Sequence, residues 1–137
     1  LGIVVRDNNT YESVTQRLDS QLEAGKCYKF TVHLARAPRY VSKSHITHMD
    51  ANYTTPIVLR IWGGSGPCDD RELLAQTDAV SNTNWQLYAL EFNPKLKIRF
   101  ITLEAYYKTS EQLPYNGHIL VDGCSDIIKI PCRNEEK

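Results

Sequence analysis

The sequence predicts an all-β protein, an antiparallel β-sandwich or jelly roll of about eight strands. In residues 26–36, KCYKFTVHLAR, every second side chain from Tyr28 to Leu34 is aromatic or aliphatic, and the side chains between them are polar. This period of two is typical of a strand with one face in a core and one face in water. Similar stretches recur at intervals of about 8–12 residues, and no stretch has the periodicity of a long helix.

Alternating stretches bounded by turn-forming residues define the expected elements in order. Turns are expected at Asp7-Asn8-Asn9-Thr10, in the glycine-rich segment after residue 62, and at Asn93-Pro94. Two longer segments, 37–55 and 108–116, have no such pattern and are expected to be loops, which often bind ligands when they are long. We expect strands at residues 1–6, 11–18, 26–36, 56–63, 71–76, 85–92, 97–107, 118–122 and 127–130, with one helical turn as the alternative for 71–76.

The inward faces of these strands predict the core. An apolar face must be buried against a second sheet, so the alternating aliphatic residues of the longest strands should meet in the interior. The predicted core contains Phe30, Val32, Leu34, Ile57, Leu59, Ile61 and Leu103.

Length and charge exclude several classes of protein. The 137 residues suit one domain, and the 16 basic and 16 acidic side chains give no field that would attract nucleic acid or an anionic membrane. No apolar run approaches the roughly 20 residues that cross a bilayer, so we expect no direct membrane insertion. Residues 1–137 are expected to form one module excised from a larger protein with its first strand missing, because LGIVV resembles a strand entered midway.

The four cysteines, Cys27, Cys68, Cys124 and Cys132, are compatible with two disulfides in any of three pairings, or with four buried free thiols. None of the spacings is CxxC, which argues against a zinc site or a redox motif. If consecutive strands run up and down, Cys27, Cys68 and Cys124 lie at one end of the sandwich and the two long loops at the other. We therefore favour a Cys27–Cys68 disulfide.

Four sequence motifs carry a family resemblance. They are YESVTQRLDSQLEAGKCYKFTVHL, VLRIWGG, NWQLYALEFNP and GHILVDGCSDI. In their order and spacing from residue 11 to residue 130 they resemble jelly-roll carbohydrate-binding modules, galactose-binding-like β-sandwiches of secreted or surface proteins of Gram-negative bacteria.

The resemblance implies a non-catalytic, extracytoplasmic module, which would be secreted, periplasmic or displayed on the bacterial cell surface, with a glycan as its partner. The alternative is a structural or protein-interaction module of a cell-envelope assembly, with an envelope or surface protein as its partner and no glycan ligand. The family also holds a structural calcium. Asp122 matches the acid of the family's closing strand, but the N-terminal ligands of that ion are not recognisable.

Candidate ligand-binding residues fall into two sets. Arg60, Trp62, Glu104 and Tyr106 could face outward from a common sheet, where an aromatic face and paired polar groups suit a sugar ring. The alternative is a simple cross-strand Arg–Glu pair covered by aromatic rings. The second set is the loop tyrosines Tyr40, Tyr53, Tyr107 and Tyr115.

Catalytic and metal motifs are weak. Ser65 lies in GGSG without the nucleophile elbow of hydrolases, and Glu104 with Asp122 or Glu91 has no motif that marks a glycosidase pair. We therefore expect no enzyme, with a small hydrolase as the third hypothesis. His45 and His48 lie near Asp50, but solvated loop histidines explain them more simply than a metal site.

Overall fold

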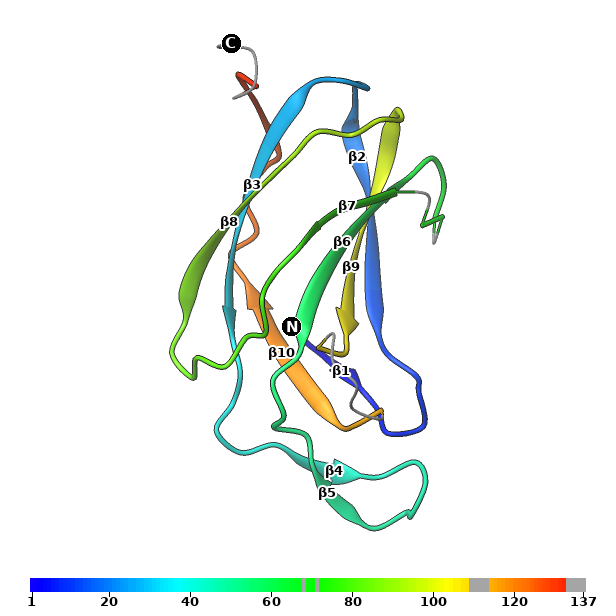
Figure 1. Ribbon diagram of the computed structural model, residues 1–137, viewed down its shortest axis with the longest axis vertical. Helices are drawn as coiled ribbons and strands as arrows, with labels where there is room; N and C mark the ends of the chain where they lie inside the picture. The colour runs from blue at the N-terminus through cyan, green and yellow to red at the C-terminus, as the bar shows by residue number, and fades with distance from the viewer. Residues whose placement is uncertain (68, 71, 109–113, 133–137) are drawn as a thin grey trace.

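The computed structural model describes residues 1–67, 69–70, 72–108 and 114–132, which form an antiparallel β-sandwich (Figure 1). Sheet A contains β1 (Gly2–Val5), β10 (Gly117–Asp122), β3 (Cys27–Ala35) and β8 (Gln86–Phe92), with β11 (Ile128–Ile130) following β10 along the same edge of β3. Sheet B has the order β2 (Ser13–Leu22), β9 (Ile98–Tyr106), β6 (Val58–Gly64) and β7 (Glu72–Gln76). The predicted all-β sandwich is confirmed, and its jelly-roll topology stays a prediction.

Strand β3 is the centre of sheet A. It pairs with β8 on one edge from Tyr28 to Leu34 and with β10 and β11 on the other edge. Its side chains alternate as expected, with Tyr28, Phe30, Val32 and Leu34 buried. Gly25 starts the strand from a turn with a positive φ of 82°, a conformation that glycine adopts without a Cβ clash.

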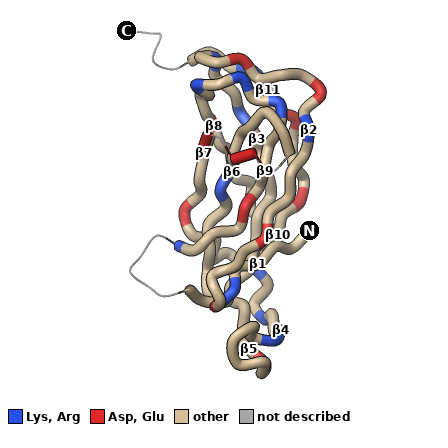
Figure 2. Tube along the Cα trace, turned by 90° about the vertical axis from the view of Figure 1, so that its right-hand side faces the viewer, with Lys and Arg blue, Asp and Glu red and all other residues tan. Residues whose placement is uncertain are grey.

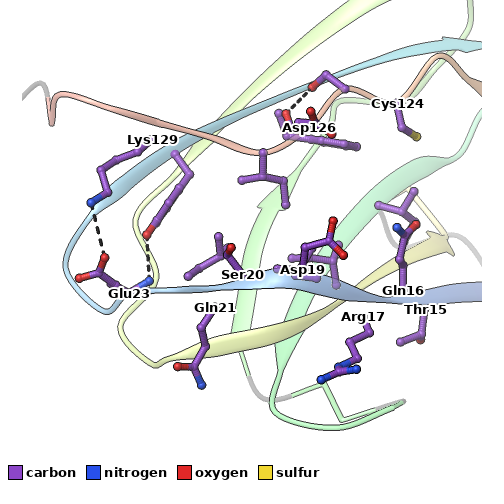
Figure 3. A pocket seen from close by; sticks show the side chains of 18 of the residues that line it. Thr15, Gln16, Arg17, Asp19, Ser20, Gln21, Glu23, Cys124, Asp126 and Lys129 are labelled. Carbon is purple, nitrogen blue, oxygen red and sulfur yellow. Dashed lines mark hydrogen bonds and ion pairs between the residues drawn. The ribbon is translucent and has the colours of Figure 1, made fainter.

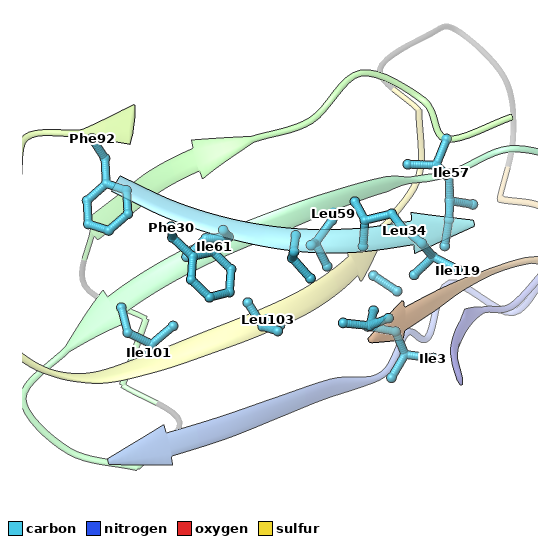
Figure 4. Close-up of a cluster of buried hydrophobic side chains, with 14 of the residues drawn as sticks. Ile3, Phe30, Leu34, Ile57, Leu59, Ile61, Phe92, Ile101, Leu103 and Ile119 are labelled. Carbon is cyan, nitrogen blue, oxygen red and sulfur yellow. The ribbon is translucent and has the colours of Figure 1, made fainter. Parts of the chain in front are cut away.

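The core lies between the two sheets (Figure 4). All seven predicted core residues are buried, and Val32, Leu34, Ile57 and Leu59 are 0% exposed. Residues from β3 on one side meet residues from β6 and β9 on the other, as expected for interdigitating inner faces. The predicted core is therefore confirmed.

The expected loop 37–55 is instead a β-hairpin that projects beyond one end of the sandwich (Figures 1 and 2). It contains β4 (Val41–Lys43) and β5 (Asp50–Asn52). A Lys43–Asp50 ion pair of 2.7 Å joins these strands. The prediction of an irregular segment was wrong because three-residue, mostly polar strands show no apolar alternation.

Asp7 holds this hairpin against the body of the protein. Its Oδ2 atom accepts hydrogen bonds from the Ser44 hydroxyl at 2.7 Å and from the Asn116 amide at 3.1 Å. The Asp7 N–H donates to Asn116 Oδ1 at 2.9 Å. The two segments predicted to be long loops therefore share one end of the sandwich, although residues 109–113 of the second lie outside the described part of the chain.

The disulfide joins Cys27 to Cys132, so the predicted Cys27–Cys68 pairing is wrong. Ile130 of β11 lies opposite Cys27, which brings Cys132 to the start of β3 with a Cα–Cα distance of 5.2 Å. Cys68 lies outside the described residues, and Cys124 is a free, exposed thiol. The disulfide indicates an oxidising compartment.

The predicted position of Cys124 at the end of the sandwich is also wrong. Its neighbour Ser125 bonds to Thr31, halfway along β3, through a backbone bond and a side-chain bond of 2.9 Å each. Asp122 lies opposite His33, so β10 ends well before the start of β3 is reached. The prediction assumed that each strand spans the full length of the sandwich, but β10 is shorter than that.

Truncation of Leu34 tests the core. Leu34→Ala should lower the free energy of unfolding by about 2–5 kcal/mol, because it leaves a cavity at a fully buried position. Leu87→Ala on the neighbouring strand is the matched control, since Leu87 is 60% exposed. Urea unfolding curves measure both, and equal effects of the two substitutions would contradict the assigned faces.

Removal of the disulfide should also cost stability. Its two cysteines are 105 residues apart, and a closed loop of this length restricts the unfolded chain strongly. Cys27→Ser with Cys132→Ser should lower the free energy of unfolding by about 2–4 kcal/mol, whereas Cys124→Ser should change it by no more than about 0.5 kcal/mol. A non-reduced digest that lacks a cross-linked Cys27–Cys132 peptide would reject the pairing.

Candidate functional site

The four residues predicted from the sequence lie together on the outer face of sheet B. Arg60 of β6 is directly opposite Glu104 of β9, and directly opposite residues point to the same face. Trp62 and Tyr106 occupy the next outward positions on these two strands. We call Arg60, Trp62, Glu104 and Tyr106 the Trp62 cluster.

Hydrogen bonds and ring contacts order the cluster. Trp62 Nε1 donates to Glu104 Oε1 at 3.1 Å. The Arg60 guanidinium lies 3.6 Å from the centre of the Tyr106 ring and 6.0 Å from that of Trp62. Arg60 Nε donates to Gln76 Oε1 on β7 at 3.1 Å, so the guanidinium is fixed from two directions.

Glu104 is a buried carboxyl group on an outer face, at 7% exposure. Burial raises its pKa above the ordinary value, because the charged form loses water; the Trp62 hydrogen bond and Arg60 oppose this shift, and Asp70 adds to it. Within the described residues no donor bonds to Oε2, and no acceptor bonds to the two Nη groups of Arg60. The cluster therefore presents a free acceptor beside two free donors.

Tyr11 extends the aromatic part of this surface. Its ring packs edge-on against Tyr106 at 5.2 Å and against Tyr107 at 6.2 Å, and it is 41% exposed. The candidate residues chosen from the sequence did not include Tyr11. The sequence could have indicated Tyr11, because it is the first outward-facing residue of the expected strand 11–18.

Two of the loop tyrosines hold the β4–β5 hairpin in place. Tyr53 is 2% exposed, and its hydroxyl donates to the Lys43 carbonyl at 2.6 Å. Tyr40 is half-buried, with its ring centre 4.4 Å from that of His118 and 5.8 Å from that of Tyr53. The Tyr53 ring is therefore buried in the protein, and the Tyr40 ring is partly covered by its aromatic neighbours.

The other two loop tyrosines also use their hydroxyl groups internally. Tyr115 donates to the Pro56 carbonyl at 3.0 Å and accepts from the Lys108 N–H at 2.8 Å. Tyr107 donates to the Arg6 carbonyl. The hydroxyl groups of Tyr53, Tyr107 and Tyr115 are therefore committed to contacts within the protein.

His118 is a buried structural residue, 0% exposed. Its Nε2 accepts the Ala37 N–H at 2.8 Å, so Nδ1 carries the proton and donates to the Tyr53 carbonyl. Burial lowers the pKa of His118, and Arg36 lowers it further, whereas the Tyr53 carbonyl raises it. The neutral ring is therefore the form that fits this site.

Glu104 forms a glycosidase pair with neither Glu91 nor Asp122. Glu104 lies on the outer face of sheet B, whereas Glu91 and Asp122 belong to strands of sheet A. Asp122 is exposed, and its Oδ1 accepts the N–H of Gly123 at 2.8 Å. Its role as a calcium ligand stays a prediction, and in the described part of the chain no three His, Cys, Asp or Glu residues gather as metal ligands.

Comparisons with known proteins add no family. No known family model matches this sequence, and no curated protein matches it either. Among the residues that the structure describes, no helix is long and apolar enough to span a bilayer. Basic and acidic residues are interspersed along the chain (Figure 2), in keeping with the equal counts of the two charges.

The buried His118 predicts a dependence of stability on pH. Its folded-state pKa lies below the ordinary value of 6.5, so the unfolded state binds more protons between these two values. The contribution of neutral His118 to the free energy of unfolding is fully present above about pH 6.5. It is lost as the pH falls towards the folded-state pKa, and the free energy of unfolding then changes by up to about 1.4 kcal/mol per pH unit.

Urea unfolding of the wild type and of His118→Gln between pH 5 and 8 measures this effect. The variant keeps an acceptor and a donor but cannot titrate, so it should lose the contribution of His118. The raised pKa of Glu104 favours the folded state as the pH falls, but this acts in both proteins and cancels in the difference. A difference that does not change with pH would contradict the neutral assignment.

Proposed function

We propose that this protein is a non-catalytic glycan-binding module and that the Trp62 cluster is its ligand surface. One observation carries the proposal: Arg60 and Glu104 are fixed side by side between aromatic rings, with two donors and one acceptor uncommitted. Neighbouring hydroxyls of a sugar are both donors and acceptors, and such a pair can bind two of them at once.

The aromatic rings supply the second element of sugar recognition. A sugar ring has an apolar C–H face that packs on an aromatic side chain, and Trp62, Tyr106 and Tyr11 surround the polar pair. All except Tyr11 lie on strands in the middle of sheet B, so their positions are fixed before a ligand arrives. Pre-ordered side chains lose less entropy on binding, which favours this surface over a loop.

The disulfide and the motif resemblance support an extracytoplasmic location. A Cys27–Cys132 bond persists in an oxidising compartment, and the resembled modules occur in secreted, periplasmic or surface-displayed proteins of bacteria. The proposal is non-catalytic because neither Glu91 nor Asp122, the carboxylates considered as partners of Glu104, lies on the same sheet as Glu104.

A second candidate is a protein-interaction module of a cell-envelope assembly. The observation that favours it is the tip of the projecting hairpin, where Ile46 is 58% exposed and Met49 is 68% exposed. Exposed apolar side chains on a projecting element suit contact with another protein.

A glycan array followed by calorimetry tests the first proposal. Wild-type protein should bind at least one class of glycan weakly, and Trp62→Ala should reduce the affinity at least 10-fold, about 1.4 kcal/mol. Trp85→Ala is the matched control, because Trp85 is 49% exposed outside the cluster, and it should bind as the wild type does. Equal losses in the two variants would reject the Trp62 cluster as the site.

The same experiment separates the two candidates. If the wild type binds no glycan, and an envelope protein is retained by the wild type but not by a variant with Ile46→Ser and Met49→Ser, the interaction module is the correct function. Because these two side chains are exposed, the double variant should keep the melting temperature of the wild type.

A further inference from the structure

A groove of about 610 Å³ runs along one side of the sandwich, between β2 and the segment 124–129 (Figure 3). This volume lies in the range of about 300–1,000 Å³ that is typical of ligand sites. The groove is separate from the Trp62 cluster, none of whose members lines it.

Unequal sheet widths create the groove. Near the hairpin end, β1 covers the outer edge of β10, and its ladder ends where Leu1 exchanges backbone bonds with Val121. Farther along, β11 is the edge of sheet A, while β2 of sheet B continues to Leu22. Among the residues that the structure describes, no strand lies beside the outer edge of β11, so this part of β2 has no strand of sheet A facing it.

Both walls of the groove leave regular pairing. The register between β2 and β9 shifts between Arg17 and Leu22. On the other wall, the five residues between Asp122 and Ile128 lie along the three residues between His33 and Lys29. These irregular stretches widen the gap between the two edges.

The floor of the groove is apolar, and its rim is polar. Its floor is formed by half-buried and buried side chains of both sheets: Val14, Leu18, Phe30, Leu103 and Ile127. Asp19 and Asp126 lie on the two walls of the rim. One end is closed by Glu23, whose N–H bonds to the Tyr28 hydroxyl at 2.8 Å and whose carboxylate pairs with Lys129 at 3.5 Å.

We propose that one extended strand of a partner protein occupies this groove and pairs with the edge of β11 that no described residue covers. The strand runs antiparallel to β11, in line with β1, which pairs with β10 in the same sense. Its alternate side chains are apolar and point to Leu18, Phe30 and Leu103. A lysine or arginine side chain complements Asp19 and Asp126, which lie opposite each other on the two walls (Figure 3).

The backbone edge of β11 favours a peptide strand over other classes of ligand. An uncovered strand edge presents unpaired N–H and C=O groups, which an added strand satisfies and an acyl chain does not. A glycan would need an exposed aromatic face, but the aromatic rings here, Tyr28 and Phe30, are only 4% and 6% exposed. Strand addition uses both the apolar floor and the free edge.

Selection from a displayed library of random nonapeptides on the protein of residues 1–137 tests the proposal. Enriched peptides should have apolar residues at every second position, and a synthetic peptide of the consensus should bind the wild type. N-methylation of the alternate amides that face β11 should weaken binding at least 10-fold, because it removes the ladder bonds. On binding, hydrogen exchange should slow in residues 124–130.

Two groove variants and one control locate the binding. Leu18→Arg places a charge on the floor, and Ser20→Trp fills the groove from an exposed position that does not disturb the core. Each should reduce affinity for the peptide at least 10-fold. Leu87→Arg, on the edge strand β8 of the same sheet, should bind as the wild type does.

Several results would overturn the proposal. These are a selection without enrichment, a consensus without alternation, binding that tolerates N-methylation, or protection along β8 instead of residues 124–130. Loss of peptide binding in Leu87→Arg would also reject it. So would sedimentation experiments that show a dimer of the wild type which Ser20→Trp converts to a monomer, because a second copy of the chain would then fill the groove. If Leu18→Arg does not fold, the affinity of Ser20→Trp for the consensus peptide decides between the two outcomes.

Discussion

The pairing of strand β3 on both of its edges is the interaction on which the rest of the structure depends. The strand donates and accepts backbone bonds on both edges, to β8 on one side and to β10 and β11 on the other. Its inward side chains fill the middle of the core, and its first residue is half of the disulfide. Because a slip of one residue would turn Phe30, Val32 and Leu34 to solvent, burial of this face fixes the register of the whole of sheet A.

The two proposed surfaces follow from how each sheet is completed. Sheet B is continuous from β2 to β7, so its outer face can hold side chains in fixed positions, and the Trp62 cluster lies there. Sheet A changes its edge strand along its length, from β1 to β11, and the groove lies at that change. A continuous face suits recognition by side chains, whereas an interrupted edge suits recognition by backbone.

Features with a strong periodic pattern were predictable, and features that depend on register were not. The core followed from alternation, and the Trp62 cluster followed from the outward positions of two strands that the fold makes neighbours. The β4–β5 hairpin was missed because its strands are short and polar. The disulfide partner was missed because β10 ends at Asp122 and β11 carries the chain to Cys27. The sequence also does not reveal that Tyr53 and Tyr115 use their hydroxyl groups internally.

The position of the Cys27–Cys132 bond has a mechanical consequence. Strand β11 has only three residues, and without the bond a force on the chain beyond Cys132 would peel it from β3 one ladder bond at a time. With the bond in place, that force passes covalently to the first residue of β3. Strand β3 is held on both edges, so it must be sheared from its neighbours together. The disulfide thus makes this end of the sandwich a point at which tension can be applied without unravelling the sheet.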